Sequence, residues 1–188
     1  KAASRMSASF AQRAVAKTYL ALCERGTKSL AAGAEGRLAA TLRFDQQRRR
    51  AVPVAASAAS AVSAEAGRGN DARSVSLGYS VLGVQGEHAL LAVRPREGFK
   101  HQIRALLSLH GLPIIGDLRY GGPRCEALAL HAAAVQLPHP ILAHPKLRLR
   151  AAVPPEWGRL LPPSTRSLVA LASRRLARDV EDWTTDTG

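Results

Sequence analysis

The sequence predicts an α+β domain with a mixed, mostly antiparallel sheet and flanking helices. Segments with the two-residue alternation of strands outnumber segments with helical periodicity, and short turn-forming stretches join neighbouring strands into hairpins. The length of 188 residues, 46% of them hydrophobic, suffices for one well-packed core. We therefore expect one domain over residues 1–162, followed by a helical extension over 163–188.

The first half of the chain is expected to hold one helix and four strands. These are a helix over 4–13 and strands over 15–23, 37–44, 75–84 and 88–93. Lys17 and Tyr19 lie two residues apart in the first strand, so they share one face of the sheet. The last two strands meet near Gly86 and form an antiparallel hairpin.

A short amphipathic helix follows this hairpin. Ile103, Leu106 and Leu107 recur at the spacing of one helix face, which continues to His110. Gly111 suits the C-terminal end of the helix, and the proline two residues later prevents its continuation. The result is a helix directly after a strand, closed by a loop rich in turns.

The later elements are two more strands and a second amphipathic helix. The strands are expected over 127–137 and 146–153, and the helix over 164–183. Four apolar side chains lie on or near one face of that helix, namely Leu168, Leu171, Leu176 and Val180. The helix either packs on the domain or docks a partner protein.

Residues 46–72 differ from the rest of the chain. After Arg48-Arg49-Arg50 the stretch consists mainly of Ala, Ser and Val. Such side chains bury too little apolar area to offset the entropy lost on ordering. We expect an insertion or a mobile loop, whose arginine run either contacts phosphate or is simply solvated.

The charge balance favours a polyanionic partner. Lys and Arg number 27 against 14 Asp and Glu, which gives a net charge of +13. This suits RNA or DNA better than a small acidic molecule, although a basic protein without such a partner is the alternative. Aromatic residues make up only 4%, so a stacking platform of several rings is excluded.

Cysteine and histidine usage indicates neither disulfides nor a metal site. Cys23 and Cys125 are the only cysteines, which fits a reduced intracellular compartment. Pro140 breaks any helix that would align His139 with His144, so we expect no bound metal. No apolar run reaches the length of a membrane span, so no membrane association is expected.

The most specific stretch is 97–104, together with the loop over 111–121 after its helix. Lys100 and Arg104 lie four residues apart, so they stand on one side of the helix near its N-terminal end. Unpaired N–H groups at that end already favour anions. The stretch therefore predicts one wall of a site that attracts a carboxylate or a phosphate.

The same stretch closely resembles the signature of the RluA-type pseudouridine synthases. That signature reads G-R-x-H-Q-I-R, then a helix, then G-x-P-I-x-G-D-x-x-Y, against residues 98–104 and 111–120 here. Three further pieces occur in the family's order, at 15–22, 130–132 and 139–140. The resemblance covers roughly residues 5 to 162.

The resemblance implies a fold, a reaction and a substrate. The fold would be that of pseudouridine synthases, with the active-site cleft across the middle of the sheet. The reaction would isomerise uridine to pseudouridine in structured RNA, with ribosomal RNA as the expected class. The bond from ribose to uracil N1 breaks, the base rotates, and C5 is joined instead. An Asp carboxylate drives this reaction at a flipped-out uridine without metal or cofactor.

Four residues match the family's active site by position. Arg104 matches the basic residue that forms an ion pair with the catalytic Asp, and Tyr19 matches the active-site tyrosine that stacks on the base and assists proton transfer at C5. Ile103 and Gln102 would shape the substrate pocket. The structural alternatives are a surface arginine, a half-buried strand tyrosine and ordinary core packing.

Further residues are expected to bind RNA or to have structural roles. Lys17, Arg94, Lys100 and Arg119 would flank the cleft and position phosphates. His131 is expected to be a hydrogen-bonded structural histidine, and Asp117 to cap a turn.

Two departures from the family pattern stand out. The family's catalytic Asp lies in H-R-L-D-x-x-T-S-G, shortly before the Lys-x-Tyr strand, and this motif does not occur in residues 1–188. Phe99 stands where the family has the first Arg of its signature, so either a shifted cation such as Lys100 compensates or substrate binding has changed. None of Asp45, Asp71, Asp117 and the acidic residues of the C-terminal tail lies in a context that could replace the missing carboxylate.

Three hypotheses follow. The chain is the C-terminal part of an enzyme whose Asp lies upstream, which we favour because it starts abruptly at Lys1. Alternatively, it is an inactive synthase-like factor that binds RNA during ribosome assembly. The third is an unrelated basic ribosomal or DNA-binding protein, which no helix-turn-helix or zinc motif supports. The Ala- and Arg-rich composition suggests a mitochondrial, ribosome-associated protein, with the cytoplasm as the alternative.

Overall fold

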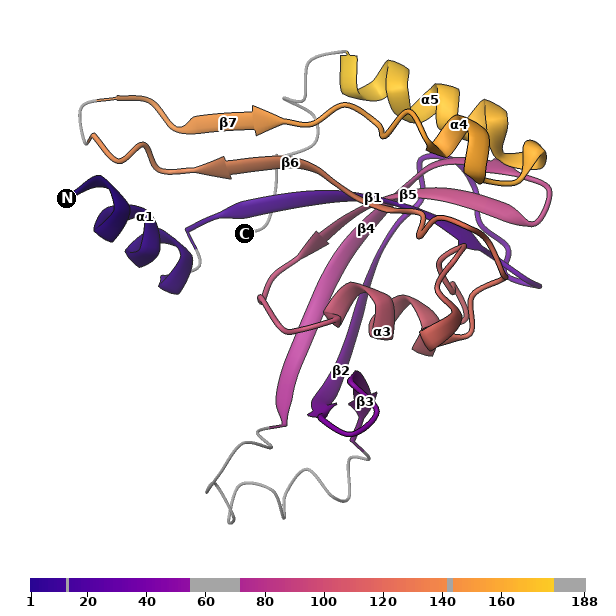
Figure 1. The fold of residues 1–188 in the computed structure, drawn as a ribbon, viewed down its shortest axis with the longest axis horizontal. Coiled ribbons are helices and arrows are strands. Elements are labelled where there is room, and N and C mark those ends of the chain that lie inside the picture. The colour runs from indigo at the N-terminus through magenta and orange to yellow at the C-terminus, as the bar shows by residue number, and fades with distance from the viewer. Residues whose placement is uncertain (13, 55–71, 142–143, 178–188) are drawn as a thin grey trace.

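A seven-stranded sheet runs through the middle of the computed structural model (Figure 1), with strand order β3-β2-β4-β5-β1-β6-β7. The structure describes residues 1–12, 14–54, 72–141 and 144–177. The strands are β1 (Ala16–Glu24), β2 (Glu35–Asp45), β3 (Arg50–Pro53), β4 (Arg73–Gln85), β5 (His88–Pro95), β6 (Leu130–Leu137) and β7 (Leu147–Arg150). The helices are α1 (Ala2–Ala11), α3 (Gln102–Leu109), α4 (Trp157–Leu160) and α5 (Arg166–Ala177), with 3-10 turns η1 (Leu118–Tyr120) and η2 (Pro163–Thr165).

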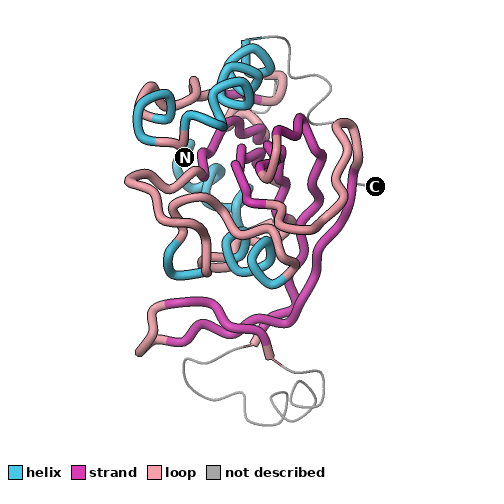
Figure 2. Tube along the Cα trace, turned by 90° about the vertical axis from the view of Figure 1, so that its right-hand side faces the viewer, coloured by secondary structure: helices cyan, strands magenta, loops and turns pink. Residues whose placement is uncertain are grey.

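Every strand pairing within the described ranges is antiparallel, which confirms the predicted α+β class with a mostly antiparallel sheet. Figure 2 shows that the sheet is twisted rather than flat, as expected for strands of L-residues. In Figure 1, α3 lies on one side of the sheet and α5 on the other. The sheet is therefore covered on both faces near its centre.

Strand β1 lies at this covered centre, between β5 and β6. Leu20, Ala21, Leu22 and Cys23 are completely buried, although successive side chains of a strand point to opposite faces. Two packed faces explain why this part of the strand is continuously apolar. The position of β1 also fixes Lys17 and Tyr19, which precede the buried run on the same strand.

The predicted hairpin and central helix are confirmed. Strands β4 and β5 pair from Gln85 opposite His88, and Gly86 in the turn between them has a φ of +56°. That left-handed conformation is one that glycine adopts without strain. Helix α3 begins at Gln102 and ends at Leu109, so it delivers the signature residues directly after β5 and a short connecting segment.

The prediction for 46–72 is partly wrong, because residues 50–53 form strand β3 on the edge of the sheet. Its register pairs Phe44 with Ala51 and Asp45 with Arg50. Ala51 is 3% exposed, and its N–H donates to the Tyr120 hydroxyl at 2.7 Å. Residues 50–53 are therefore held by backbone hydrogen bonds, which do not depend on the size of their side chains. Residues 55–71 lie outside the described part of the chain.

Other boundaries shift by a few residues. Strand β6 begins at Leu130 rather than at 127, and β7 covers only the middle of the predicted 146–153. Helix α5 is shorter than the predicted 164–183 in the described residues, and Val180 lies beyond them. The division at residue 162 stays a prediction.

Of the two possibilities for the last helix, packing on the sheet is observed. Leu168 and Leu176 are buried, and a Cβ added to Gly83 of β4 would come within 3.1 Å of a Leu168 methyl carbon. The glycine therefore permits close approach of the helix to the strand. Helix α5 is part of the same apolar core as the central strands.

Substituting Leu168→Ala is expected to lower the free energy of unfolding by about 2 to 5 kcal/mol, because the lost methyl groups leave a cavity. The control Leu109→Ala removes the same atoms from a side chain that is 48% exposed, and should change stability by no more than about 0.5 kcal/mol. Urea unfolding measures both. Equal effects of the two substitutions would contradict the packing of α5.

Candidate active site

A cavity of about 330 Å³ lies between the start of β1 and the signature segment. Its lining includes five of the eight predicted site residues, which are Lys17, Tyr19, Gln102, Ile103 and Arg104. Lys17 and Tyr19 reach it from β1, which agrees with their expected position on one face. The cavity is large enough for a nucleobase, since ligand pockets begin at roughly 300 Å³.

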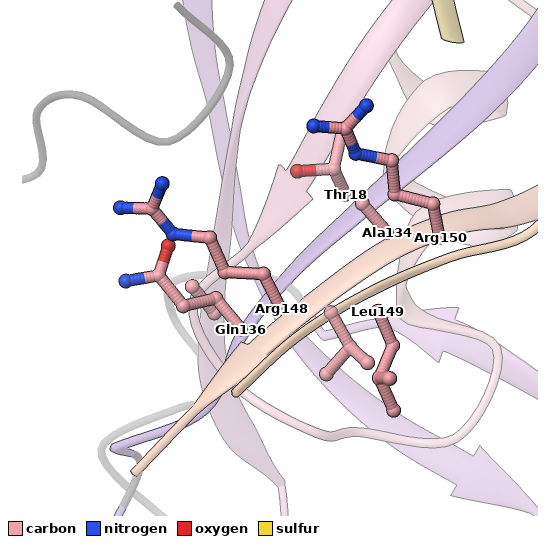
Figure 3. Close-up of a pocket in the computed structure, with 8 residues that line it drawn as sticks. Thr18, Ala134, Gln136, Arg148, Leu149 and Arg150 are labelled. Atoms are coloured by element: carbon pink, nitrogen blue, oxygen red, sulfur yellow. The ribbon is translucent and has the colours of Figure 1, made fainter. Parts of the chain in front are cut away.

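A second hollow, between β1, β6 and β7, is much smaller (Figure 3). It holds about 20 Å³ and is lined by residues that include Thr18, Gln136, Arg148 and Arg150. A single water molecule needs about 10 to 15 Å³ on this measure. This hollow therefore has no room for a base, and the larger cavity is the candidate active site.

Gln102 is a buried residue that stabilises one wall of the cavity through its side-chain hydrogen bonds. Its side-chain amide nitrogen donates to the Ser76 carbonyl at 2.8 Å and to Glu97 Oε2 at 3.0 Å, and its Oε1 accepts the Phe99 N–H. The residue is 3% exposed, so these bonds satisfy an otherwise costly buried amide. Gln102 thus fastens the signature segment to β4.

His101 stands at the N-terminal boundary of α3 with a left-handed φ of +59°. Its ring lies edge-on to Phe44 and Tyr120, and its Nδ1 is 3.1 Å from the Tyr120 hydroxyl. Desolvation, assisted by the positive charges of Arg104 and Arg119, lowers the pKa of His101 below its ordinary value. The imidazole is therefore neutral at physiological pH.

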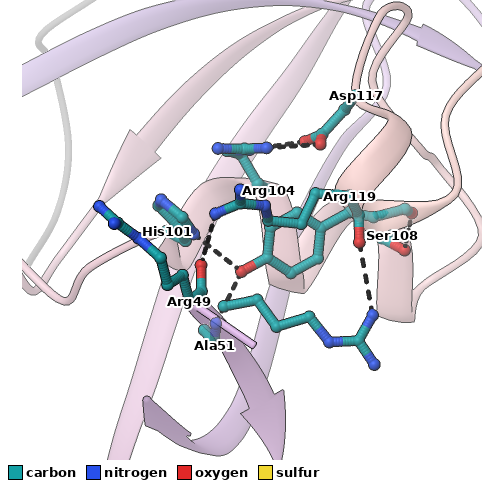
Figure 4. Close-up of polar contacts among 9 residues, drawn as sticks. Arg49, Ala51, His101, Arg104, Ser108, Asp117 and Arg119 are labelled. Atoms are coloured by element: carbon teal, nitrogen blue, oxygen red, sulfur yellow. Dashed lines mark hydrogen bonds and ion pairs between the residues drawn. The ribbon is translucent and has the colours of Figure 1, made fainter. Parts of the chain in front are cut away.

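Arg104 and Asp117 form a buried ion pair (Figure 4). The guanidinium Nε donates to Oδ2 at 2.7 Å and Nη2 donates to Oδ1 at 2.6 Å. The Asp117 side chain is completely buried and that of Arg104 is 19% exposed. The hydrogen bonds from the guanidinium to this carboxylate raise the pKa of Arg104.

The prediction that Asp117 caps a turn is wrong. Asp117 precedes η1, but its side chain makes no capping hydrogen bond there and points to Arg104 instead. The pair is thirteen residues apart in sequence, so no local pattern indicates it. The one sequence signal that links Arg104 and Asp117 is that both belong to the same signature.

Tyr120 ends the matched signature, but the sequence argument gave it no role in the site. The Arg104 guanidinium carbon lies 5.0 Å from the centre of its ring, which is cation–π geometry. Its hydroxyl accepts the N–H of Ala51 in β3, and burial raises its pKa. Figure 4 shows how these contacts join η1, α3 and β3 around Arg104.

The predicted phosphate-binding residues do not all lie together. Lys17 lines the cavity, whereas Lys100 is exposed with its Nζ 4.2 Å from the centre of the Phe44 ring. Arg119 is also exposed and donates to the Arg49 carbonyl at 2.6 Å. Arg94 is on β5, bonded to Ser80, and does not line the cavity. Of the four predicted phosphate-binding residues, Lys17 alone is part of the described lining of the cavity.

Other predicted residues have clear positions. His131 lies 3.1 Å from the Ala151 carbonyl and edge-on to Trp157, as expected for a hydrogen-bonded histidine.

Within the described ranges, no three His, Cys, Asp or Glu side chains are grouped as a metal site would require. No described helix is long and apolar enough to cross a membrane.

Comparison with known proteins identifies the family. The family model described as RNA pseudouridylate synthase matches residues 1–109. The chain belongs to this family. The matched residues include all five cavity residues that were predicted from the signature and from the first strand.

Curated relatives of the chain match over shorter stretches. It is 33% identical over 84 residues to tRNA pseudouridine synthase C of Salmonella typhi, covering 39% of this chain and 32% of that protein. It is 41% identical over 75 residues to an RNA pseudouridine synthase of Chloroflexus aurantiacus, covering 37% and 23%. The chain thus spans about a third or less of these curated relatives.

Solved structures support the fold. Human RNA pseudouridylate synthase domain containing 1 matches with a TM-score of 0.61 at 19% identity, covering 90% of this chain and 70% of that one. Human RNA pseudouridylate synthase domain containing 4 matches with a TM-score of 0.56 at 21% identity, covering 93% and 67%. The pseudouridine synthase fold predicted from the signature is confirmed.

The neutral state of His101 can be tested by NMR titration. We expect its imidazole to titrate below 6.5, the ordinary value. Arg119→Gln should raise the pKa part of the way, because it removes one of the positive charges nearby. The control Arg159→Gln, on the exposed side of α4, should leave it unchanged.

The same shift affects stability. At a pH between the lowered pKa of His101 in the folded protein and 6.5, this residue binds more protons in the unfolded chain than in the folded one. The contribution of His101 to the free energy of unfolding therefore falls as the pH falls through that interval. A His101 that titrates at or above 6.5 in the unsubstituted protein would contradict the desolvated environment.

Proposed function

We propose that this chain is the catalytic-domain part of an enzyme that isomerises uridine to pseudouridine in structured RNA, with ribosomal RNA as the preferred substrate class. The observation that carries the proposal is the single cavity in which Tyr19, Ile103 and Arg104 meet. Family membership supports the reaction type. The Salmonella relative is named for tRNA, which makes tRNA the alternative substrate.

In this proposal a flipped-out uridine enters the cavity. Tyr19 lies against the base, Ile103 supplies an apolar wall, and the wall fastened by Gln102 excludes water. The bond from ribose C1′ to N1 breaks and a bond from C1′ to C5 forms. The proton that leaves C5 is balanced by the one that N1 gains, so no oxidant or cofactor is needed.

The nucleophilic carboxylate would come from a segment outside residues 1–188. Arg104 would keep that carboxylate ionised, because a buried charge needs a compensating partner. Lys17, Lys100, Arg119 and Arg94 would hold the RNA backbone around the cavity. We further propose a mitochondrial location, association with a ribosomal particle and a protein partner on the outer face of α5.

Tyr19→Phe and Arg104→Ala are expected to abolish pseudouridine formation by the natural full-length protein, since each removes a group at the reacting base or its carboxylate. Release of tritium from C5 of labelled uridine in RNA measures the reaction. RNA binding at moderate salt should persist, because phosphate contacts supply most of it. The control Tyr79→Phe changes a tyrosine outside the cavity and should retain full activity.

Lys17→Gln and Lys100→Gln are each expected to weaken RNA binding uniformly across sequences. Each should reduce the slope of log affinity against log salt by about one, as expected for a lost phosphate contact. The control Lys146→Gln removes an exposed lysine immediately before β7. A slope that is the same in all three variants would disprove the assigned backbone contacts.

A second candidate function is an inactive RNA-binding factor. Two observations favour it: Phe99 stands at an Arg position of the family signature, and Arg104 is already paired with Asp117. Intact mass and peptide mapping of the natural polypeptide distinguish the two. An upstream His-Arg-Leu-Asp segment supports the enzyme, whereas a complete chain without it, with RNA binding but no tritium release, supports the factor.

A further inference from the structure

Backbone hydrogen bonds of the surrounding loop hold Asp117 in place, in addition to the contacts of its side chain. Its backbone N–H donates to the Ile114 carbonyl at 3.0 Å, and its carbonyl accepts from Gly122 at 2.9 Å and from Tyr120 at 3.1 Å. Gly116 has a φ of +82°, and a Cβ there would overlap the Ala127 carbonyl. The loop therefore has one close-packed conformation, and the carboxylate is held in place before it meets any partner.

This fixed carboxylate binds one edge of the Arg104 guanidinium. Two parallel N–H···O bonds, on Nε and Nη2, define both the plane and the rotation of the group. The Tyr120 ring then supports one face of the guanidinium. A long arginine side chain, which ordinarily has many rotamers, is thereby held in a single orientation.

The terminal edge of the Arg104 guanidinium, formed by Nη1 and Nη2, remains for another acceptor. A guanidinium carries five N–H donors, and the two bonds to Asp117 leave three, on Nη1 and Nη2. Arg104 lines the cavity, whereas Asp117 is completely buried behind it. An acceptor approaching from the cavity therefore meets an edge with the geometry for a second carboxylate.

We propose that Asp117 is a positioning residue, which orients Arg104 so that its free edge takes the carboxylate of the nucleophile in the cavity. This inference rests on the proposed function, because it needs a nucleophilic Asp supplied from outside these residues. Asp117 acts through Arg104 and does not touch the base. Its charge also balances Arg104 while the cavity is empty, so the arginine is not left as an unpaired buried cation.

The test uses the natural full-length protein and its Asp117→Asn variant, which keeps the size of the side chain and removes the charge. We expect kcat for tritium release to fall by about 10- to 100-fold, the loss that a small misplacement of a reacting group causes. KM for RNA should stay within about threefold, since Asp117 lies behind the cavity wall. The control Glu87→Gln removes an exposed carboxylate in the β4–β5 turn and should change neither.

An NMR measurement separates positioning from a merely structural role. In protein with ¹⁵N-labelled arginine, Arg104 should show slow rotation of its guanidinium, with separate Nη resonances assigned by their loss in Arg104→Lys. Asp117→Asn should merge these resonances while the folded fraction and the other arginine signals stay unchanged. Asp117→Glu, which keeps the charge but displaces it by one methylene, should give intermediate rates and partial averaging.

The outcomes decide the inference and the proposed function separately. Unchanged kcat and unchanged Arg104 resonances in a folded Asp117→Asn variant would overturn the positioning role. If the unsubstituted protein forms no pseudouridine in any RNA tested, the proposed function fails, and the resonances alone decide the inference. Mobile Arg104 signals in the unsubstituted protein would overturn it even if Asp117→Asn failed to fold.

Discussion

The buried pair of Arg104 and Asp117 is the constraint on which the candidate site depends. Removing either partner would leave an uncompensated buried charge, at a typical cost of about 3 to 5 kcal/mol. The pair ties α3 to the loop before η1, and Tyr120 in η1 then binds the backbone of β3 through its hydroxyl. One wall of the cavity and one edge of the sheet are thus held together by a continuous set of polar contacts. Truncating any member would affect elements that are far apart in sequence.

The electrostatics of this region follow from the same arrangement. Three cations, Arg104, Arg119 and Lys100, surround His101 and together with desolvation keep it neutral. A neutral imidazole can share a hydrogen bond with the Tyr120 hydroxyl without adding a positive charge beside Arg104 and its partner Asp117. The positive charge around His101 therefore comes from these arginine and lysine side chains rather than from the imidazole.

The sequence predicted those parts of the molecule in which local pattern and tertiary contact agree. Three features are of this kind: the alternating pattern of the β4–β5 hairpin, the apolar face of α3, and the position of Lys17 and Tyr19 on the same face of β1. Strand β3 could not be predicted, because Ala51 is held by β2 and by a hydroxyl 69 residues away rather than by its own side chain. The role of Asp117 was misread for the same reason, since a turn is local and its partner is not.

The departure at Phe99 has a structural consequence for the charge inside the cavity. Phe99 lines the wall, while the cation next to it, Lys100, lies over the Phe44 ring and does not line the cavity. Lys100 therefore does not supply the charge that the family's arginine would bring inside. Lys17 is better placed, because its Nζ is 3.9 Å from where a Cβ on Gly98 would stand, beside the altered position. Apart from Arg104, which is paired with Asp117, the positive charge in this cavity thus comes from Lys17 on β1. In the proposed reaction, the strand that carries Tyr19 would therefore also contact a phosphate of the nucleotide whose base lies against Tyr19.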